Sequence, residues 1–258
     1  MTQDVTYQVN EHVARVTINR PERRNAISLA VQEHLVELFD EASNDPDVRV
    51  VVVTGAGDRA FCAGADLREL DDLARSGRPV ATPMTGSRRN LFETVLETYK
   101  PTIAALNGPA VAGGCELALA CDLRVAAEHA YLGLPEAKRG MGANFASVVL
   151  PRLVPRAVAL EMLYTGNPID ARTALGWGLY NRVVADDVMA AADDLARTIA
   201  ANAPLTVRRY KEMAIKGWEL PVPAALRLNA GPNPYASRDR EEGVRAYLER
   251  RPPHWEGR

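Results

Sequence analysis

The stretch PTIAALNGPAVAGGCELALACD, residues 101–122, gives the strongest indication of the fold. Residues 102–107 are mostly apolar, a Gly-Pro pair follows, and residues 113–121 are rich in Gly, Ala, Leu and Cys. The apolar part predicts a buried strand, and the small-residue part predicts a helix that packs closely against its neighbours. A strand, a tight turn and a helix in this order are typical of α/β proteins.

Strand and helix patterns alternate on both sides of this stretch. Before it we expect strands over residues 5–9, 13–19 and 48–54 and helices over 29–44, 67–74 and 88–97; after it we expect short strands over 123–126 and 130–132. The unit of two strands and a helix recurs about three times, at intervals of roughly 45–55 residues. This recurrence favours a stacked spiral of ββα units over a doubly wound parallel sheet.

The chain becomes mostly helical after about Leu134. Expected helices cover residues 143–153, 156–164, 171–177, 187–203, 205–216 and 238–250. We therefore predict a ββα core over residues 1–195 and a C-terminal helical region over 196–258 that folds back on the core or holds a neighbouring subunit. The Gly-, Pro- and Ser-rich residues 76–87 predict a mobile surface loop, a candidate lid.

Composition narrows the class of protein. The 258 residues are 47% hydrophobic and 25% charged, which is ordinary for a soluble globular chain. The formal charge of −2 provides no field that would attract nucleic acid. No apolar run approaches the roughly 18 residues needed to cross a membrane, and the N-terminus lacks a signal or transit pattern. A cytoplasmic protein is the expectation.

The cysteines and histidines do not suggest a metal site or a disulfide framework. Cys62, Cys115 and Cys121 form no C-x-x-C pair, and the four histidines are scattered along the chain. Residues 55–60, GAGDRA, match the dinucleotide fingerprint G-x-G-x-x-G/A, but a second turn follows where a helix is required. We expect no metal and no nicotinamide cofactor.

Two small-residue segments precede predicted helices. They are FCAGAD, residues 61–66, and NGPAVAGGCE, residues 107–116. The first N–H groups of a helix lack intrahelical partners, so small side chains would let a ligand oxygen reach them. Two such amides on one oxygen would form an oxyanion hole. The alternative is that the small residues only permit close packing of helix on strand.

Two glutamates stand out in apolar surroundings. Glu116 lies within the small-residue helix, and Glu136 follows Leu134-Pro135. Burial would raise the pKa of either carboxyl towards the range that is useful for proton transfer. The alternative for Glu136 is a surface residue or a partner of Lys138 or Arg139, and the sequence does not show whether the two carboxylates meet.

Taken together, these segments resemble the enoyl-CoA hydratase/isomerase (crotonase) family over nearly the whole chain. The matching stretches are NRPERRNA (19–26), AFCAGADL (60–67), residues 101–122, LPE (134–136), EMLYTG (161–166), residues 171–179 and DREEG (239–243). The resemblance implies a spiral of ββα units with a C-terminal helical region that builds trimers or hexamers. It also implies an acyl-CoA thioester substrate, with coenzyme A as part of the substrate and no separate cofactor.

The resemblance assigns roles to individual residues. The backbone amides of Ala65 and Gly113 would hold the thioester oxygen, Glu116 would deprotonate the water that adds at Cβ, and Glu136 would exchange the proton at Cα. Coenzyme A would lie against a set of residues near these amides: Arg23, Arg24, Ala63, Gly64, Ala65, Asp66, Leu67, Arg68 and Gly114. Because both acids are present, the resemblance favours hydration of a 2-enoyl-CoA to a 3-hydroxyacyl-CoA.

One segment departs from the family. Hydratases of this family resemble G-x-x-P-G-x-G-G over residues 140–147, where this chain has GMGANFAS, with Asn144 in place of a glycine whose amide helps to hold the water. This departure keeps two alternatives open: an isomerase that moves a double bond in an enoyl-CoA, and a non-enzymatic acyl-CoA-binding protein. The acyl group itself is not specified by the sequence.

Overall fold

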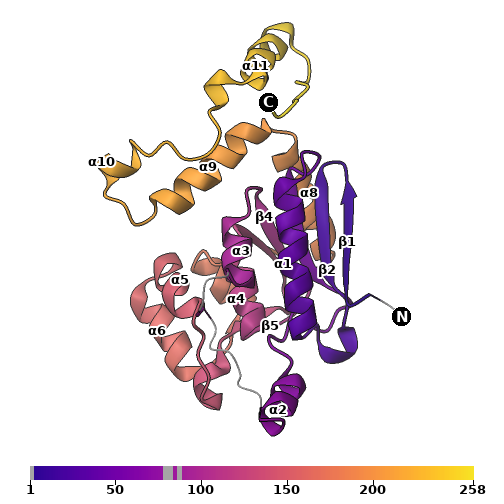
Figure 1. Ribbon diagram of the computed structural model, residues 1–258, viewed down its shortest axis with the longest axis vertical. Helices are drawn as coiled ribbons and strands as arrows, with labels where there is room; N and C mark the ends of the chain where they lie inside the picture. The colour runs from indigo at the N-terminus through magenta and orange to yellow at the C-terminus, as the bar shows by residue number, and fades with distance from the viewer. Residues whose placement is uncertain (1–2, 78–83, 86–88) are drawn as a thin grey trace.

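The computed structural model of the chain describes residues 3–77, 84–85 and 89–258. Its main sheet has the order β1-β2-β3-β4-β6-β9 (Figure 1). The strands are β1 (Val5–Asn10), β2 (Val13–Ile18), β3 (Val50–Gly55), β4 (Thr102–Leu106), β6 (Leu123–Ala127) and β9 (Arg182–Val184). Strands β1 and β2 form the predicted antiparallel hairpin, and every later pair in this sheet is parallel.

The central strands are buried on both faces, as their unbroken apolar sequences predict. Val51 and Val53 of β3 belong to the core under α1 (Leu29–Asn44), whereas Val50 and Val52 belong to a second core under α8 (Val188–Ala200). Side chains alternate between the faces of a strand, so one strand contributes to both cores. Figure 1 shows α1 on one side of this sheet and α8 on the other.

A second, smaller sheet joins the predicted short strand near residues 130–132 to two segments that the sequence did not mark as strands. It consists of β5 (Ala110–Val111), β7 (Tyr131–Gly133) and β8 (Ile169–Asp170). Strands β5, β8 and β9 are absent from the sequence expectations, which treated the chain beyond Leu134 as helical apart from loops. Strands of two or three residues are too short to display an alternating pattern, and they form here through long-range pairing.

Most of the remaining helices lie close to their predicted positions. They are α2 (Leu67–Arg75), α3 (Leu91–Glu97), α4 (Gly113–Ala120), α5 (Ala146–Leu153), α6 (Arg156–Thr165), α7 (Ala171–Gly176), α9 (Pro204–Gly217) and α11 (Arg238–Glu249). The four-residue helix α10 (Val222–Ala225) was not predicted. Short 3-10 helices cover η1 (Pro21–Arg23), η2 (Pro135–Arg139) and η3 (Pro234–Ala236). The predicted loop over 76–87 falls largely outside the described residues. Among the described residues, no helix is long and apolar enough to cross a membrane.

The C-terminal helices α9, α10 and α11 extend away from the sheet as an arm (Figure 1). The end of the chain returns to the body, where Trp255 donates from Nε1 to the carbonyl of Ala201 and accepts from Arg49 at its own carbonyl. Large apolar side chains on this arm remain exposed, among them Leu226 and Tyr247. The predicted division at residues 195–196 lies within α8, and it stays a prediction.

Candidate active site

The glycine-rich loop after β3 is held by two buried asparagines. Asn25 donates from Nδ2 to the carbonyls of Ala56 and Ala60, and Asn107 donates from Nδ2 to the carbonyl of Gly57 at 2.6 Å. A Cβ on Gly55 would lie 2.3 Å from the Phe61 carbonyl oxygen, so only glycine fits there. The first helix after this loop begins at Leu67, and the GAGDRA motif is accounted for by the packing of the loop.

The two small-residue segments of the sequence lie directly against each other. Cys62 pairs with Ala110 in an isolated parallel bridge, and its carbonyl accepts from the N–H of Val111 at 2.9 Å. A Cβ on Gly114 would lie 2.1 Å from the Cys62 carbonyl oxygen, and a Cβ on Gly64 would lie 2.8 Å from the Gly113 nitrogen. The small residues therefore do permit close packing, and this packing brings Gly64 and Ala65 next to the start of α4.

The first residue of α4, Gly113, lies beside Gly64 and Ala65. A Cβ built on Gly113 would lie 3.6 Å from Gly64 Cα and 3.8 Å from the Ala65 nitrogen. Within the described residues, neither the Ala65 N–H nor the Gly113 N–H donates a hydrogen bond to any acceptor. Ala65 is exposed to solvent. Neighbouring N–H groups without protein acceptors are the donors from which an oxyanion hole is built.

A strained residue sets the direction of the Gly113 amide. Ala112, the residue before α4, has φ +55° and ψ −127°, a region that L-residues rarely adopt. Its N–H donates to Gly133 at 2.8 Å and its carbonyl accepts from Glu116 at 3.0 Å, so both sides of the residue are held. Strain of this kind costs on the order of 1–3 kcal/mol and is concentrated at functional sites.

Glu116 is buried in α4, and one of its oxygens is fully engaged. Oε1 accepts from the N–H groups of Phe145 at 3.0 Å and Ala146 at 2.9 Å, at the start of α5. Burial raises the pKa of Glu116 to about 7, the charge of Glu136 adds to the rise, and the two backbone hydrogen bonds oppose it. The carboxyl group therefore titrates close to neutral pH, where a general base is most effective.

Glu136 is buried in η2, and its Oε2 atom has no hydrogen-bond partner among the described residues. Burial raises the pKa of this carboxyl, and the charge of Arg139 opposes the rise. Its charge acts on Glu116, so the two carboxyl groups lie within electrostatic reach of each other. A buried carboxyl oxygen without a partner is costly, and it is the kind of feature that marks a functional group.

The two stretches assigned to coenzyme A lie side by side. The Ala63 N–H donates to the Arg24 carbonyl, and the Asp66 N–H donates to the Ile27 carbonyl. Asp66 also has a structural role, because it accepts from the Arg68 N–H at the start of α2 and from the Arg20 side chain at 3.0 Å. Burial raises the pKa of Asp66, but these hydrogen bonds outweigh it and hold that pKa below its usual value.

The basic residues predicted for coenzyme A remain available at this edge. Arg23 is half-buried, whereas Arg24 and Arg68 are exposed, and in the described part of the chain none of the three forms an ion pair. Leu67 beside them is half exposed despite its size. An apolar side chain flanked by unpaired guanidinium groups suits a ligand that carries both apolar and phosphate parts.

Two aromatic side chains near the site were not anticipated from the sequence. The ring of Phe92 in α3 lies 3.5 Å from the position of a Cβ on Gly113. It contacts the ring of Phe145, with centroids 5.5 Å apart and an interplanar angle of 46°. No sequence signal could have found this pair, because 53 residues separate its members and a lone phenylalanine is indistinguishable from a core residue.

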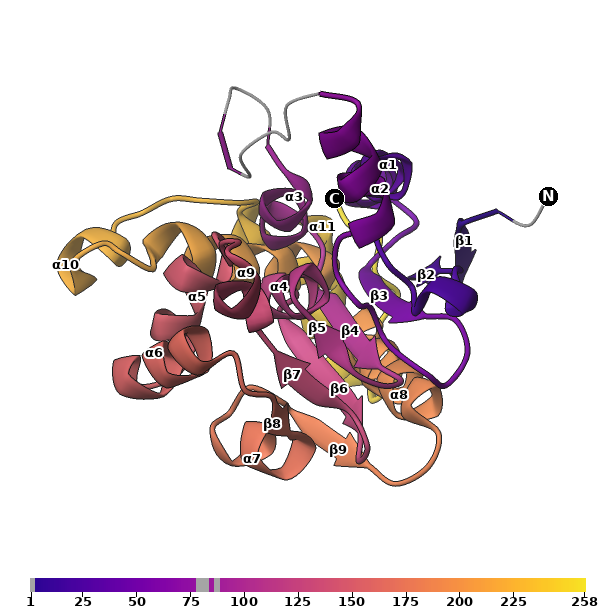
Figure 2. The same ribbon diagram turned by 90° about the horizontal axis from the view of Figure 1, so that it is seen from below.

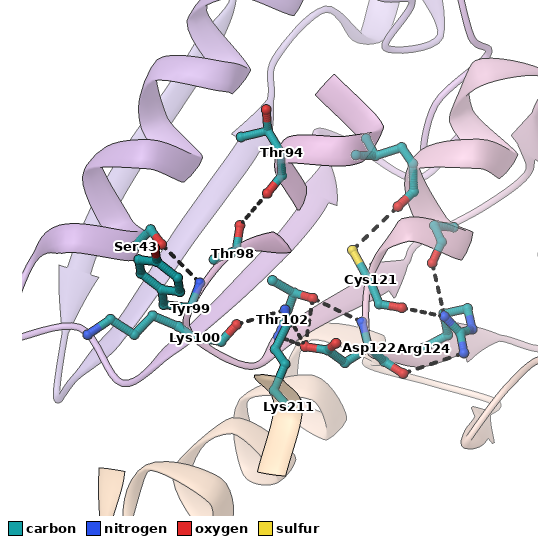
Figure 3. A network of polar contacts seen from close by, with 12 residues as sticks. Ser43, Thr94, Thr98, Tyr99, Lys100, Thr102, Cys121, Asp122, Arg124 and Lys211 are labelled. Carbon is teal, nitrogen blue, oxygen red and sulfur yellow. Dashed lines mark hydrogen bonds and ion pairs between the residues drawn. The ribbon is translucent and has the colours of Figure 1, made fainter. Parts of the chain in front are cut away.

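The far end of α4 lies in a dense polar network (Figure 3). Arg124 is buried and donates to the carbonyls of Ala118, Cys121 and Leu179. Asp122 accepts from the N–H and the hydroxyl of Thr102 and from Lys211 Nζ at 2.8 Å. Arg124 thereby satisfies the Ala118 carbonyl of α4 and the carbonyl of the following residue, Cys121, and its positive charge stabilises the negative end of the helix dipole.

Among the residues that the structure describes, no group of three or more His, Cys, Asp or Glu side chains could hold a metal ion. All three cysteines are buried as free thiols. Burial raises the pKa of the Cys62 thiol to about 12, so that thiol stays protonated and unreactive at neutral pH.

Comparison with known protein families finds one family whose profile matches this chain. The profile described as enoyl-CoA hydratase/isomerase matches residues 8–258. An (E)-benzylidenesuccinyl-CoA hydratase of Thauera aromatica is 38% identical, over 98% of this chain and 99% of that protein. A putative enoyl-CoA hydratase of Thermus thermophilus is 42% identical over 95% of this chain and 97% of that one.

Further relatives differ in the reaction that their names describe. A carnitinyl-CoA dehydratase of Citrobacter koseri is 37% identical and matches over the full length of both chains. Among solved structures, an enoyl-CoA hydratase of Bacillus anthracis superposes with a TM-score of 0.89 at 34% identity, covering 99% of this chain and 100% of that one. The fold predicted from the sequence is confirmed by this match.

Proposed function

This chain belongs to the enoyl-CoA hydratase/isomerase family, and from that premise we propose that it is an enoyl-CoA hydratase. It adds water across the double bond of a 2-enoyl-CoA and gives a 3-hydroxyacyl-CoA. The observation that supports this proposal most directly is the combination of two neighbouring amides without acceptors and two buried acids of raised pKa. Hydration needs a place for negative charge, a base and an acid, and each is provided by a separate group.

Coenzyme A binds along the edge formed by residues 23–27 and 63–68. The guanidinium groups of Arg23, Arg24 and Arg68 attract its phosphates, and Leu67 contacts its apolar parts. The thioester oxygen then enters the space between the N–H groups of Ala65 and Gly113. No separate cofactor is needed, because coenzyme A belongs to the substrate.

The reaction starts with Glu116 ionised and Glu136 protonated. Glu116 takes a proton from water as the water oxygen bonds to Cβ, and the electron pair of the double bond moves to the thioester oxygen. The N–H groups of Ala65 and Gly113 stabilise the resulting enolate. Glu136 then gives its proton to Cα, and exchange with solvent returns a proton from Glu116 to Glu136.

The raised pKa values support this division of labour. Burial raises the pKa of Glu136, which shifts this carboxyl towards the form that donates a proton. Glu116 has two N–H donors on Oε1 that favour its ionised form, and its pKa of about 7 allows it to act as a base at neutral pH.

The test is an assay of crotonyl-CoA and longer 2-enoyl-CoA thioesters, followed by loss of the conjugated thioester absorbance. We expect hydration of at least one of these substrates. A protein that hydrates none of them but converts 3-enoyl-CoA into 2-enoyl-CoA is an isomerase. One that binds acyl-CoA without any turnover is a binding protein.

We also propose that the chain forms trimers or pairs of trimers through its C-terminal arm. Apolar side chains on α9 to α11 and the segments between them are exposed in the single chain, including Leu226, Tyr235, Tyr247 and Leu248. A patch of this extent on a soluble protein is typical of an interface. Sedimentation equilibrium of the full chain tests this, with a mass three or six times that of one chain expected.

A further inference from the structure

The two rings of Phe92 and Phe145 link the amide end of the candidate site to its acid end. The tip of the Phe92 ring lies 3.5 Å from the position that a Cβ on Gly113 would occupy. The same position lies 3.8 Å from the Ala65 nitrogen. Phe145 carries one of the two N–H groups that bind Glu116 Oε1. The contact between the rings therefore connects the Gly113 end of the site to the segment that binds Glu116, and we call these two rings the aromatic wall.

The shape of this wall is fixed by the fold. Phe145 is almost completely buried, and its backbone is anchored by Glu116, so its ring has little freedom. Phe92 is half-buried on α3, a helix that begins with a capping box formed by Asn90 and Glu93. The other two phenylalanines of the chain, Phe39 and Phe61, are fully buried. Phe145 belongs to the same core as these two, and Phe92 is the one phenylalanine that stays partly exposed.

We propose that Phe92 and Phe145 determine substrate specificity, and that they favour a 2-enoyl-CoA with a flat conjugated group beyond Cβ, such as an aryl ring, over a straight alkyl chain. This inference rests on the proposed function for the identity of the thioester site. A conjugated acyl group stays coplanar with the thioester and loses little conformational freedom on binding, whereas each ordered alkyl torsion costs entropy. A third ring can also contact the half-buried Phe92 ring in tilted or offset geometry, while the buried Phe145 ring holds Phe92 in place.

The test compares cinnamoyl-CoA with 2-hexenoyl-CoA as substrates of the wild-type chain and of Phe92→Leu and Phe145→Leu. We expect the ratio of kcat/KM for cinnamoyl-CoA to kcat/KM for 2-hexenoyl-CoA to fall by about three- to tenfold in each variant, as the usual strength of aromatic pairs implies. The ratio is measured within one protein preparation, so partial unfolding cancels. Phe39→Leu changes a fully buried ring that forms no ring contact with Phe92 or Phe145 in the described part of the chain, so it is the matched control and should leave the ratio unchanged.

Binding of saturated analogues separates this inference from the hydratase assignment. Calorimetric titration with 3-phenylpropanoyl-CoA and hexanoyl-CoA requires no turnover, and the phenyl analogue should lose more affinity than the alkyl analogue in both variants. Absence of hydration with this binding pattern intact would contradict the proposed function and leave the specificity inference standing. An unchanged ratio and unchanged relative affinity in both variants would overturn the inference, whichever reaction the protein performs.

Discussion

The backbone polar groups at the two ends of α4 differ in whether they have hydrogen-bond partners within the protein. At the start of the helix, the Gly113 N–H has no protein acceptor and the preceding Ala112 holds a strained conformation. At the other end, Arg124 donates to the carbonyls of Ala118 and Cys121, and Asp122 is paired with Lys211. The same eight-residue helix therefore has an N–H without an acceptor at its start and side-chain donors on its carbonyls at its end.

The acidic side chains show the same contrast. Asp122 accepts two hydrogen bonds from Thr102 and one from Lys211, and Glu212 on the arm pairs with Arg208 and Lys216. Glu136 has an oxygen that pairs with none of the described residues. A fold gains stability by satisfying its polar groups, so groups left unsatisfied indicate where a ligand is expected. Five substitutions test this contrast, beginning with the one that has the largest expected effect.

The largest effect is expected from Glu136→Gln. Loss of the proton donor at Cα should lower kcat for hydration by about 10²- to 10⁴-fold, the usual contribution of general acid–base catalysis. Affinity for a saturated acyl-CoA should stay near that of wild type, because the amide keeps the shape of the carboxyl. Steady-state kinetics and calorimetry measure the two quantities. Glu161→Gln, an exposed acid on α6, is the control, and equal activity of the two variants would remove Glu136 from the mechanism.

Arg124→Met tests the satisfied end of α4. Removing the buried guanidinium leaves three carbonyls without their donor, so the free energy of unfolding should fall by about 3–5 kcal/mol. Lys211→Met should cost less, about 1.5–3 kcal/mol, because Asp122 keeps its two bonds from Thr102. Urea unfolding measures both, with the exposed Arg156→Met as control. The folded fraction of each variant should keep kcat near the wild-type value.

A loss of kcat in folded Arg124→Met that matches the loss in Glu136→Gln would contradict the contrast. It would mean that the satisfied end of α4 takes part in chemistry and not only in stability.

Gly64→Ala tests the open end. Gly64 has φ +84°, and a Cβ there would lie 2.8 Å from the Gly113 nitrogen, so the added methyl group must displace one of the two amides. We expect kcat/KM to fall by about 10²- to 10³-fold, the usual effect of losing one oxyanion donor. Gly176→Ala, where a Cβ meets no atom within 4 Å, is the matched control and should keep full activity. Near wild-type kinetics in a folded Gly64→Ala variant would argue against an oxyanion at this position.

The smallest effect concerns pH and Glu116. The pKa of Glu116 is about 7 in the folded chain and 4.5 for the free group. Between pH 4.5 and 7 the folded state therefore keeps a proton on Glu116 that the unfolded state has released. This contribution to stability is complete below pH 4.5 and is lost as the pH rises through 7. The stability difference between wild type and Glu116→Gln should therefore change by roughly 3 kcal/mol across that interval.

Unfolding curves of both proteins at several pH values measure this change, with the exposed Glu128→Gln as control. If the free energy of unfolding changes with pH in the same way in wild type and in Glu116→Gln, the pKa of Glu116 is not raised by folding. In the same interval, kcat/KM of the wild type should fall as the pH is lowered below 7, because the base becomes protonated.

The local pattern of the sequence was sufficient for the elements that carry the site. The helix between Ser28 and Asp45 was predicted from its apolar spacing, and Ser28 caps α1 by accepting from the Val31 N–H. The strand before Asn107 and the helix after Ala112 follow from residues 101–122 alone. Such elements are decided by neighbours in sequence, so their signals lie within a short window.

The site itself could be anticipated only in part. The resemblance to a known family pointed to Ala65, Gly113, Glu116 and Glu136, but no local pattern places residues 65 and 113 around one space. The departure at Asn144 drew attention to residues 140–147, yet the sequence did not indicate that the Phe145 and Ala146 amides bind Glu116. These hydrogen bonds form only when two segments about 30 residues apart pack together in the right relative orientation.

The amino-acid sequence by itself determined the α/β class, the order of the main elements and the family, because apolar periodicity, caps and short motifs are local properties. Only the tertiary structure decided which amides stay unpaired, which acid keeps a free oxygen and which two rings meet. The physical reason is that pairing and burial belong to groups from different segments. They are settled when the segments pack together, and no stretch of the chain holds that information alone.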